Sequence, residues 1–208
     1  FSPAQRIWDT LLFPVRALFL QDRNALGLTS LRHERLMRVY ALCKGRVLDV
    51  GCGPHDEFVR EYLGQSRGIG IDIHPYEGVK RVIPDMTRLP FEDESFDTVT
   101  LNAVGGHIPK TLRNSEFREF ARVLRTSGRL IMTEGEPITQ TIHHLWIGVY
   151  FRLLGRTDVD RERGMDDEEE YAMPRNEIVR YLNTPPLQLA QRIRFQWGLN
   201  NIYLAVRM

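Results

Sequence analysis

The sequence predicts an α/β fold: a doubly wound, mainly parallel seven-stranded sheet that ends in an antiparallel hairpin. Short apolar, strand-like segments alternate with helical patterns between residues 31 and 133, which is typical of a parallel sheet covered on both faces. The first strand-like segment runs straight into a glycine-rich turn at residues 51–53. The last two, residues 187–195 and 200–206, are separated by four residues, which is too few for a crossover helix.

The individual elements follow from the spacing of their apolar residues. Residues 31–42 repeat apolar side chains at helical intervals, and an amphipathic helix is expected over 115–124, stopped by Ser127-Gly128. A helix is also expected at 56–63, between two strands. The five parallel strands are expected at residues 46–50, 68–72, 80–83, 96–101 and 129–133. Right-handed crossovers then fix the local topology, and the hairpin completes the seven strands.

Length and composition indicate a single globular domain. The chain has 208 residues, of which 42% are hydrophobic and 26% charged, enough to bury one core of ordinary size. A net charge of +1 gives no reason to expect a nucleic-acid partner. Cys43 and Cys52 do not form a disulfide framework, so a reducing, cytoplasmic location is expected.

The stretch over residues 7–20 is apolar but is interrupted by Asp9, Pro14 and Arg16. It is shorter than the roughly 20 residues that a membrane-spanning helix needs. We therefore expect it to form a helical cover for the domain, with contact at a membrane surface as the less favoured alternative.

The glycine-rich turn predicts a ligand site at the carboxyl edge of the sheet. Gly51 and Gly53 allow the backbone to approach a ligand where a Cβ would collide. Asp72 ends the second strand, 21 residues after Gly51, where a carboxylate accepts hydrogen bonds from an adenosine ribose. Asp56 stands where a dinucleotide fingerprint has its third glycine, and an acid there opposes a pyrophosphate. An NAD-type oxidoreductase is therefore the less favoured alternative.

Four runs of the sequence carry a family resemblance: VLDVGCG, GIGIDIHP, PDMTRLPFEDESFDTVTLNAV and EFARVLRTSGRLIMTE. Together they cover about residues 45–135 and resemble the class I S-adenosylmethionine (SAM)-dependent methyltransferases of small molecules, particularly the group similar to the ubiquinone/menaquinone C-methyltransferases. One departure is residues 125–128, Arg-Thr-Ser-Gly, where the family usually has a Pro-Gly-Gly turn.

The resemblance implies a Rossmann-like methyltransferase domain over residues 1–208, with SAM as cofactor and S-adenosylhomocysteine as product. Its parts would be an N-terminal helical cover (1–44), a cofactor-binding core (45–135), an inserted lid segment (138–182) and the terminal hairpin (187–207).

The resemblance also implies residues for the methionine end of the cofactor. Asp49 would face the methionine amino group, directly or through water. Gly51, Cys52 and Gly53 would line the methionine and ribose with backbone. Asn102 and Ala103, which leave the fourth strand, would meet the methionine end.

For the adenosine end, the resemblance implies four further residues. Asp72 would bind the ribose hydroxyls and Ile73 would pack on the adenine. Asp85 would accept a hydrogen bond from the adenine amino group, while the backbone N–H of Met86 reaches a ring nitrogen.

His107 follows the fourth predicted strand by a few residues, near the position of the transferred methyl group in this fold. It is either a general base or acceptor-orienting residue, because an imidazole titrates near neutrality, or a loop histidine bonded to backbone. Both interpretations stay open. Asp97 is expected to have a structural role, capping or pairing near the fourth strand.

The inserted helix expected over residues 139–154 carries four aromatic side chains with polar atoms that are candidates for the substrate pocket: His143, His144, Trp146 and Tyr150. They either pack the insertion onto the sheet or form one wall of an acceptor pocket. No third ligand stands at metal spacing, so no metal is expected. The acidic run at 166–170 is expected to be a solvated flank.

The expected function is transfer of a methyl group from SAM to a small, apolar or aromatic metabolite. The N-terminal stretch and residues 138–150 would pack together as a lid over the acceptor. A non-catalytic interaction module of the same fold is an alternative from a different class. The sequence does not indicate the oligomeric state.

Overall fold

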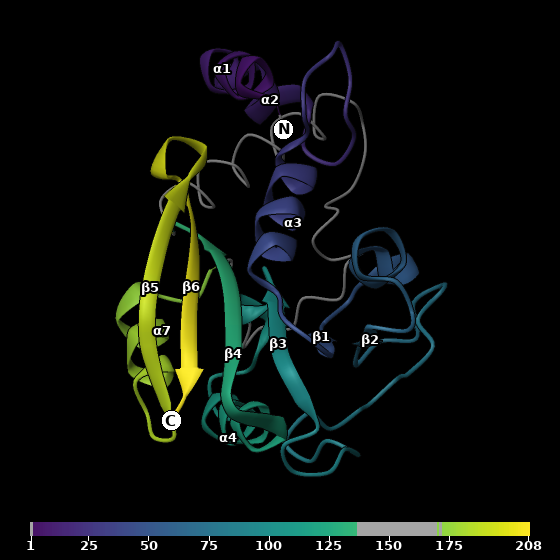
Figure 1. Cartoon of the computed structure of the whole chain (residues 1–208), viewed down its shortest axis with the longest axis vertical. Helices are drawn as coiled ribbons and strands as arrows, with labels where there is room; N and C mark the ends of the chain where they lie inside the picture. Colours follow the sequence, from purple (N-terminus) through teal and green to yellow (C-terminus); the bar gives the residue numbers. More distant parts are fainter. Residues whose placement is uncertain (1, 137–169, 171) are drawn as a thin grey trace.

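The computed structural model describes residues 2–136, 170 and 172–208. Within them lies one six-stranded sheet of order β2-β1-β3-β4-β6-β5 (Figure 1). Strands β1 to β4 are parallel to one another, β6 is antiparallel to β4, and β5 is antiparallel to β6. The strands are β1 (Val47–Val50), β2 (Gly68–Ile71), β3 (Phe96–Asn102), β4 (Leu124–Gly135), β5 (Leu187–Phe195) and β6 (Asn200–Arg207).

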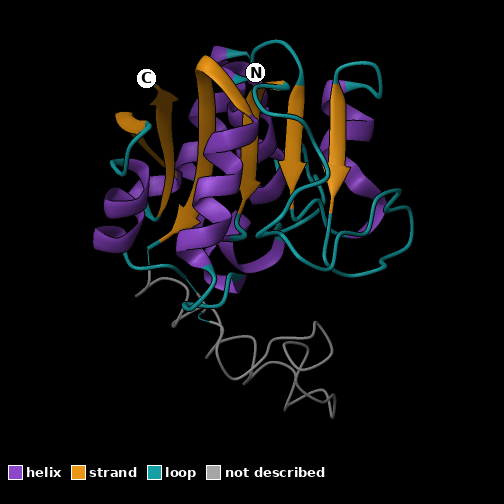
Figure 2. Cartoon of the chain, turned by 90° about the horizontal axis from the view of Figure 1, so that it is seen from below, coloured by secondary structure: helices purple, strands orange, loops and turns teal. Residues whose placement is uncertain are grey.

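Helices cover both faces of this sheet (Figure 2). On one face, α3 (Leu31–Leu42) and the π-helix η2 (Phe58–Leu63) bury apolar side chains against β1, β4 and β6. On the other face, α4 (Arg113–Val123) and α7 (Arg175–Leu182) do the same, with Phe117 stacked on Tyr181 at 4.9 Å between ring centroids. The doubly wound α/β prediction and the terminal hairpin are therefore confirmed.

A seventh strand is not confirmed. Residues 80–83 contribute one isolated parallel bridge, between Val82 and Asp72. The segment carries Lys80 and Arg81, and Val82 is 40% exposed. Too few apolar side chains are buried here to hold an edge strand against the sheet.

Two local predictions differ from the structure. The helix expected from residue 56 begins at Phe58, because Pro54–Asp56 form a tight turn (η1) with positive φ at His55 and Asp56. Strand β4 begins at Leu124 rather than at residue 129. Ser127-Gly128 lies within an irregularity, where the pairing shifts from Phe96–Leu124 to Thr98–Arg129.

The N-terminal cover consists of α1 (Pro3–Leu11) and α2 (Phe13–Phe19), held by the buried guanidinium of Arg16. Arg16 donates to the carbonyls of Asp9 (2.7 Å) and Thr29 (2.6 Å) and to Oε2 of Glu34 in α3 (2.6 Å). This network joins both helices to the sheet-covering layer.

The cover also contacts the β5–β6 turn η4 (Gln196–Gly198), at the same end of the molecule (Figure 1). Trp197 packs on Phe13 at 5.1 Å between centroids and donates its Nε1–H to the carbonyl of Thr10 (3.0 Å). The outer side of the two helices is apolar and exposed, at Ile7, Trp8, Leu11, Leu12, Val15, Leu18 and Phe19. Among the described residues, no helix combines the length and apolar character that crossing a bilayer requires.

Candidate cofactor and acceptor site

The turn after β1 lies at the switch point of the sheet, where β2 and β3 leave β1 on opposite sides. Gly51 and Gly53 both have φ of +66°. A Cβ at Gly51 would lie 2.6 Å from Cγ2 of Val104, whereas a Cβ at Gly53 would meet nothing within 4 Å. Gly51 therefore permits close packing of the β3 loop, and Gly53 presents bare backbone to open space, as a ligand approaching the turn requires.

Asp72 fixes this turn from the end of β2. Its Oδ2 accepts the backbone N–H of Gly53 and its Oδ1 that of His74, both at 2.9 Å. A carboxylate has about four acceptor positions, so each oxygen can also accept a ribose hydroxyl. Ile73, the next residue, is 41% exposed beside it. The backbone N–H groups of Gly51 and Cys52 donate to the carbonyl of Ile71, which leaves carbonyl and Cα surface for the ligand.

Asp49 is buried in β1 and lies beside two polar side chains of β3. Its Oδ1 accepts from Oγ1 of Thr100 (2.6 Å) and Nδ2 of Asn102 (2.9 Å). Burial raises the pKa of Asp49 to about 7, although these two hydrogen bonds act in the opposite direction. Oδ1 of Asn102 is buried and accepts no hydrogen bond from the described residues. The cluster therefore lacks a donor, and a cofactor's ammonium group has the chemistry to complete it.

The loop after Asn102 continues this edge. Ala103 has φ of +60°, and its N–H donates to Oγ1 of Thr133 at the end of β4 (2.9 Å). The turn η3 (Gly105–His107) follows, with an exposed His107 whose backbone N–H donates to the carbonyl of Val104. Both interpretations of the His107 side chain remain predictions.

Asp85 and Met86 lie farther along the same edge. Oδ1 of Asp85 accepts the hydroxyl and the backbone N–H of Thr87, and these hydrogen bonds lower the pKa of Asp85. The Met86 side chain is buried in the core. Glu116 of α4 is also buried, and burial followed by repulsion from Asp85 raises the pKa of Glu116 to about 7.

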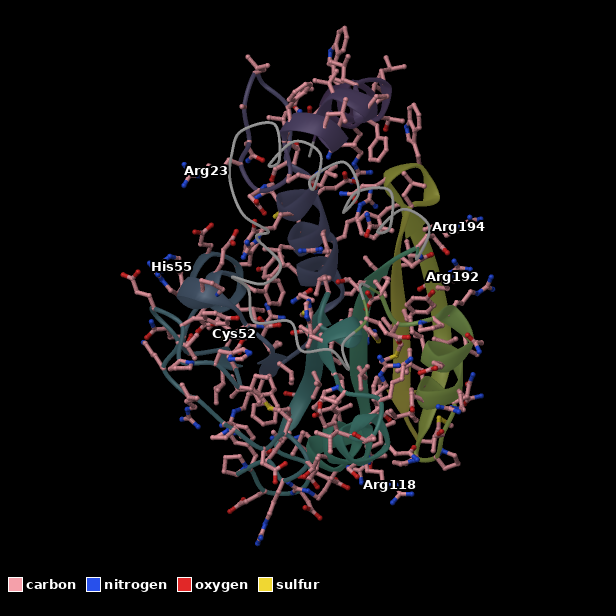
Figure 3. All side chains as sticks on the ribbon, turned by 180° about the vertical axis from the view of Figure 1, so that it is seen from behind. Arg23, Cys52, His55, Arg118, Arg192 and Arg194 are labelled. Atoms are coloured by element: carbon pink, nitrogen blue, oxygen red, sulfur yellow. The ribbon has the colours of Figure 1, made fainter. Side chains whose placement is uncertain are left out.

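The four candidates for an acceptor-pocket wall, His143, His144, Trp146 and Tyr150, lie outside the described residues. Figure 3 shows Cys52 toward the middle of the molecule and His55 at its outer edge. Burial raises the pKa of the Cys52 thiol, so it stays protonated near neutrality.

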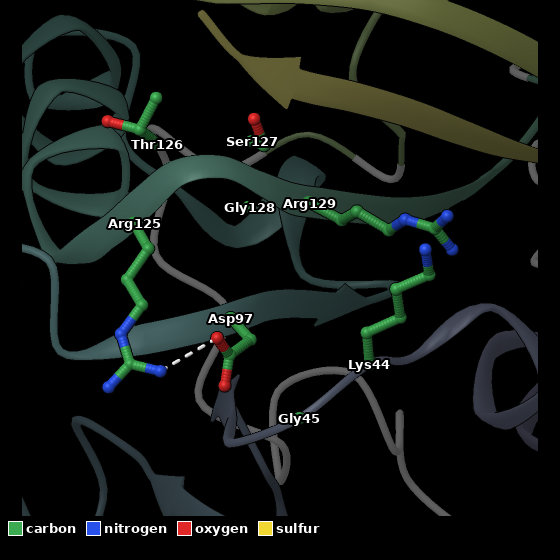
Figure 4. A pocket seen from close by; sticks show the side chains of 8 residues that line it. All are labelled: Lys44, Gly45, Asp97, Arg125, Thr126, Ser127, Gly128 and Arg129. Atoms are coloured by element: carbon green, nitrogen blue, oxygen red, sulfur yellow. Dashed lines mark hydrogen bonds and ion pairs between the residues drawn. The ribbon is translucent and has the colours of Figure 1, made fainter.

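A surface hollow at the opposite, amino edge of the strands is lined by Lys44, Gly45, Asp97 and residues 125–129 (Figure 4). Asp97 accepts the backbone N–H of Arg46 (2.7 Å) and a guanidinium N–H of Arg125 (2.8 Å). These bonds confirm its predicted structural role and account for this hollow without a ligand.

Sequence reasoning missed two buried polar residues, Arg113 of α4 and Glu134 of β4. Arg113 is fully buried and binds the carbonyl of Ile108 (3.0 Å), Glu170 (3.0 Å) and Glu177 (2.6 Å). It thereby joins the loop before α4 to the chain that precedes and begins α7. Glu134 is the penultimate residue of β4 and is 4% exposed. Asp72 was predicted as a site residue because it is a carboxylate at the end of an apolar strand. Glu134 directly follows the apolar strand predicted at residues 129–133, so the same signal could have found it.

Comparisons with known proteins agree with this geometry. A profile of a family described as "Methyltransferase domain" matches residues 48–132. The demethylmenaquinone methyltransferase of Roseiflexus castenholzii is 30% identical over 168 residues, covering 72% of this chain and 66% of that protein. Residues 48–132 therefore form a methyltransferase domain, with the fold of the SAM-dependent methyltransferases.

Other comparisons extend this assignment. The chain is 25% identical to the ubiquinone/menaquinone biosynthesis C-methyltransferase of Rickettsia massiliae, in a match that covers 58% of this chain and 56% of that protein. It thus spans between about half and two thirds of the curated relatives' length. A solved SAM-dependent methyltransferase from Aquifex aeolicus shares the fold over 100% of both chains, with a TM-score of 0.56 and 13% identity. Geranyl diphosphate C-methyltransferase from Streptomyces coelicolor A3(2) shares it with a TM-score of 0.53 and 14% identity, over 79% and 70% of the two chains.

Proposed function

We propose that this protein transfers a methyl group from SAM to a small aromatic acceptor of the hydroquinone kind. The observation that carries the proposal is the polar arrangement at the switch point: Asp49 with Asn102, the open backbone at Gly53, and Asp72. Along the carboxyl edge of the sheet, Asp49 with Asn102 matches the ammonium group of SAM, Asp72 matches its ribose, and the Gly53 backbone matches the link between them.

When bound, SAM supplies an electrophilic methyl group on a sulfonium sulfur. Asp49 and Asn102 hold the methionine amino group, and Asp72 holds the ribose while it also fixes the Gly53 backbone. The residues have mainly to place the acceptor about 3 Å behind the methyl carbon and to exclude water, since a neutral thioether leaves easily. The N-terminal helices and residues 138–182 are proposed to form that cover.

The acceptor class rests on two observations. The relatives' names refer to demethylmenaquinone and to ubiquinone/menaquinone biosynthesis, so a ring carbon of a quinol is the methylated atom in this proposal. The exposed apolar side of α1 and α2 also fits an acceptor with an apolar body rather than a protein or a nucleic acid.

Calorimetry with SAM and with NAD tests the proposal. SAM should bind once per chain and raise the melting temperature by mass action, and NAD should not. The variant Asp49→Asn should weaken SAM binding, whereas Glu92→Gln removes an exposed loop carboxylate and should leave it unchanged. Release of S-adenosylhomocysteine with 1,4-dihydroxynaphthalene would then show catalysis. Binding of NAD without SAM would favour the oxidoreductase, and SAM binding without release across a screen of quinols would favour the interaction module.

A further inference from the structure

Glu134 is a buried carboxyl group that the cofactor site does not use. It is the penultimate residue of β4 and is 4% exposed, and its Oε2 accepts no hydrogen bond from the described residues. That oxygen lies against the loop after β3, since a Cβ built on Gly105 would be 2.6 Å from it. Buried carboxyl oxygens without partners are rare in folded proteins and call for an explanation.

The cations near Glu134 do not neutralise it by direct pairing. Arg113, from α4, is committed to Glu170, Glu177 and the carbonyl of Ile108. Arg35, from α3, interacts with Glu134 electrostatically but forms no ion pair with it, and Nε of Arg35 is itself buried without a partner among the described residues.

The balance of these effects keeps a proton on Glu134 near neutrality. Burial raises the pKa of Glu134 to about 8, and the attraction of Arg35, the backbone N–H groups of Met173 and Gly105, and Arg113 offset this only in part. Arg35 in turn faces Arg32, Asp22 and Glu57. A group that gains and loses a proton close to the working pH suits general acid–base catalysis.

Glu134 also lies on the correct side of the edge. Thr133, its neighbour in β4, binds the N–H of Ala103, and Ala103 follows the Asn102 that holds Asp49. Asp72, at the ribose end, directly follows β2, which lies three strands away from β4. Glu134 is therefore next to the methionine end of the site, on the side from which an acceptor approaches the methyl group.

We propose that Glu134 is the catalytic base that accepts the proton released by the acceptor, and that Arg35 holds the acceptor's oxygen in its anionic form. This rests on the proposed function. The methyl–sulfur bond breaks with its electron pair going to sulfur, while a bond forms from the methyl carbon to a ring carbon of the acceptor. The acceptor's hydroxyl proton passes to the Glu134 carboxylate and then to solvent, which balances the lost positive charge of the sulfonium. The C–H bond of the methylated ring carbon then breaks, and its proton returns to the acceptor's oxygen, so that the ring becomes aromatic again. In this proposal an acceptor hydroxyl bonds to the two buried atoms that lack a partner among the described residues, Oε2 of Glu134 and Nε of Arg35.

The first test compares Glu134→Gln with Glu136→Gln. Glu136 is two residues away and pairs with Arg192 and Asn201 on the hairpin, so its variant should keep wild-type turnover. Glu134→Gln should bind SAM with less than a twofold change and lose about 100-fold or more in kcat, the usual contribution of a catalytic base. At saturating SAM, the wild-type kcat/KM for the acceptor should rise tenfold per pH unit up to about 8, and the rise should vanish in Glu134→Gln.

Two further measurements keep the proposal open to refutation if Gln at this position unfolds the chain or 1,4-dihydroxynaphthalene turns over slowly. Glu134→Asp should be slower but keep the pH-dependent rise. Infrared difference spectra of the wild-type protein with S-adenosylhomocysteine should show a carboxylic acid band that titrates near pH 8. The band should shift in frequency when 1,4-dihydroxynaphthalene is added. In Glu134→Asp no band should remain at the wild-type frequency. Full activity with an unchanged pH profile in Glu134→Gln, or no such band, overturns the assignment. Failure of the wild-type protein to bind SAM overturns the proposed function instead.

Discussion

The titration of Asp49 makes cofactor binding depend on pH in a direction that can be worked out in advance. Burial raises the pKa of Asp49 to about 7 in the ligand-free protein. If Asp49 holds the methionine ammonium, only its ionised form binds the cofactor strongly. Affinity for SAM should therefore be complete above pH 7 and decrease as the pH falls below that value.

The size of the effect follows from the fraction of Asp49 that is ionised. With a pKa of about 7, one carboxylate in about ten is ionised at pH 6, so affinity falls about tenfold per pH unit, or about 1.4 kcal/mol. The range from pH 5.5 to 7.5 is suitable because an α-amino group, with a pKa of roughly 7.7–8.0 in peptides, stays mainly protonated there.

Calorimetry in two buffers of different ionisation enthalpy measures both the affinity and the protons released. Wild-type protein should release close to one proton per SAM at pH 6 and fewer at pH 7.5. Asp49→Asn should bind weakly with no dependence on pH. A flat wild-type affinity over this range, or a slope that persists in Asp49→Asn, would show that Asp49 does not hold the ammonium.

Three other predictions test the rest of the site and its cover. Asp72→Ala removes an acceptor for the ribose and the ligand of the Gly53 N–H, so SAM affinity should fall at least about tenfold with the fold retained; unchanged affinity would place the ribose elsewhere. Arg16→Met removes the buried guanidinium from Oε2 of Glu34 and from the carbonyls of Asp9 and Thr29, while Arg38 stays paired with Oε1 of Glu34. It should lower the free energy of unfolding in urea by about 3–5 kcal/mol, against less than about 1 for Arg125→Met at an exposed pair; equal losses would contradict the anchoring role. Hydrogen exchange should show protection rising together in α1, α2 and residues 138–150 when S-adenosylhomocysteine binds; protection of α1 and α2 by lipid vesicles alone would favour a membrane-surface role.

The fold was predictable wherever local periodicity and burial agree. The helix at Leu31–Leu42 has the expected bounds, because its apolar spacing also describes the face it buries. The start of β4 was not predictable, since Arg125–Ser127 are exposed and polar, and their inclusion depends on pairing with β3. The turn at Pro54–Asp56 depends on Asp56 filling the space beside Gly70, a contact that no local pattern contains.

The cofactor half of the site was predictable for a related reason. Asp49, Asp72 and Asn102 each lie at or near the end of a strand next to or within β1, so the order of the strands alone brings them together. Arg113 and Glu177 are 64 positions apart, and Arg16 and Glu34 are 18 apart on different helices. Such pairs form only when helices pack, and the spacing of charges along the chain does not reveal them.

The difference between the cofactor side and the acceptor side of the sheet edge bears on which acceptor the domain would bind. The cofactor side of the edge is built from backbone and strand-end carboxylates. The side near the end of β4 has two buried polar atoms without a partner among the described residues, Oε2 of Glu134 and Nε of Arg35, and the apolar α1 and α2 lie at the same end of the molecule (Figure 1). A purely apolar acceptor would leave both polar atoms buried and unsatisfied, which is costly. A fully polar one would gain nothing from the apolar helices. The combination therefore favours an acceptor with one ionisable hydroxyl on an apolar body, which is the chemistry of a quinol.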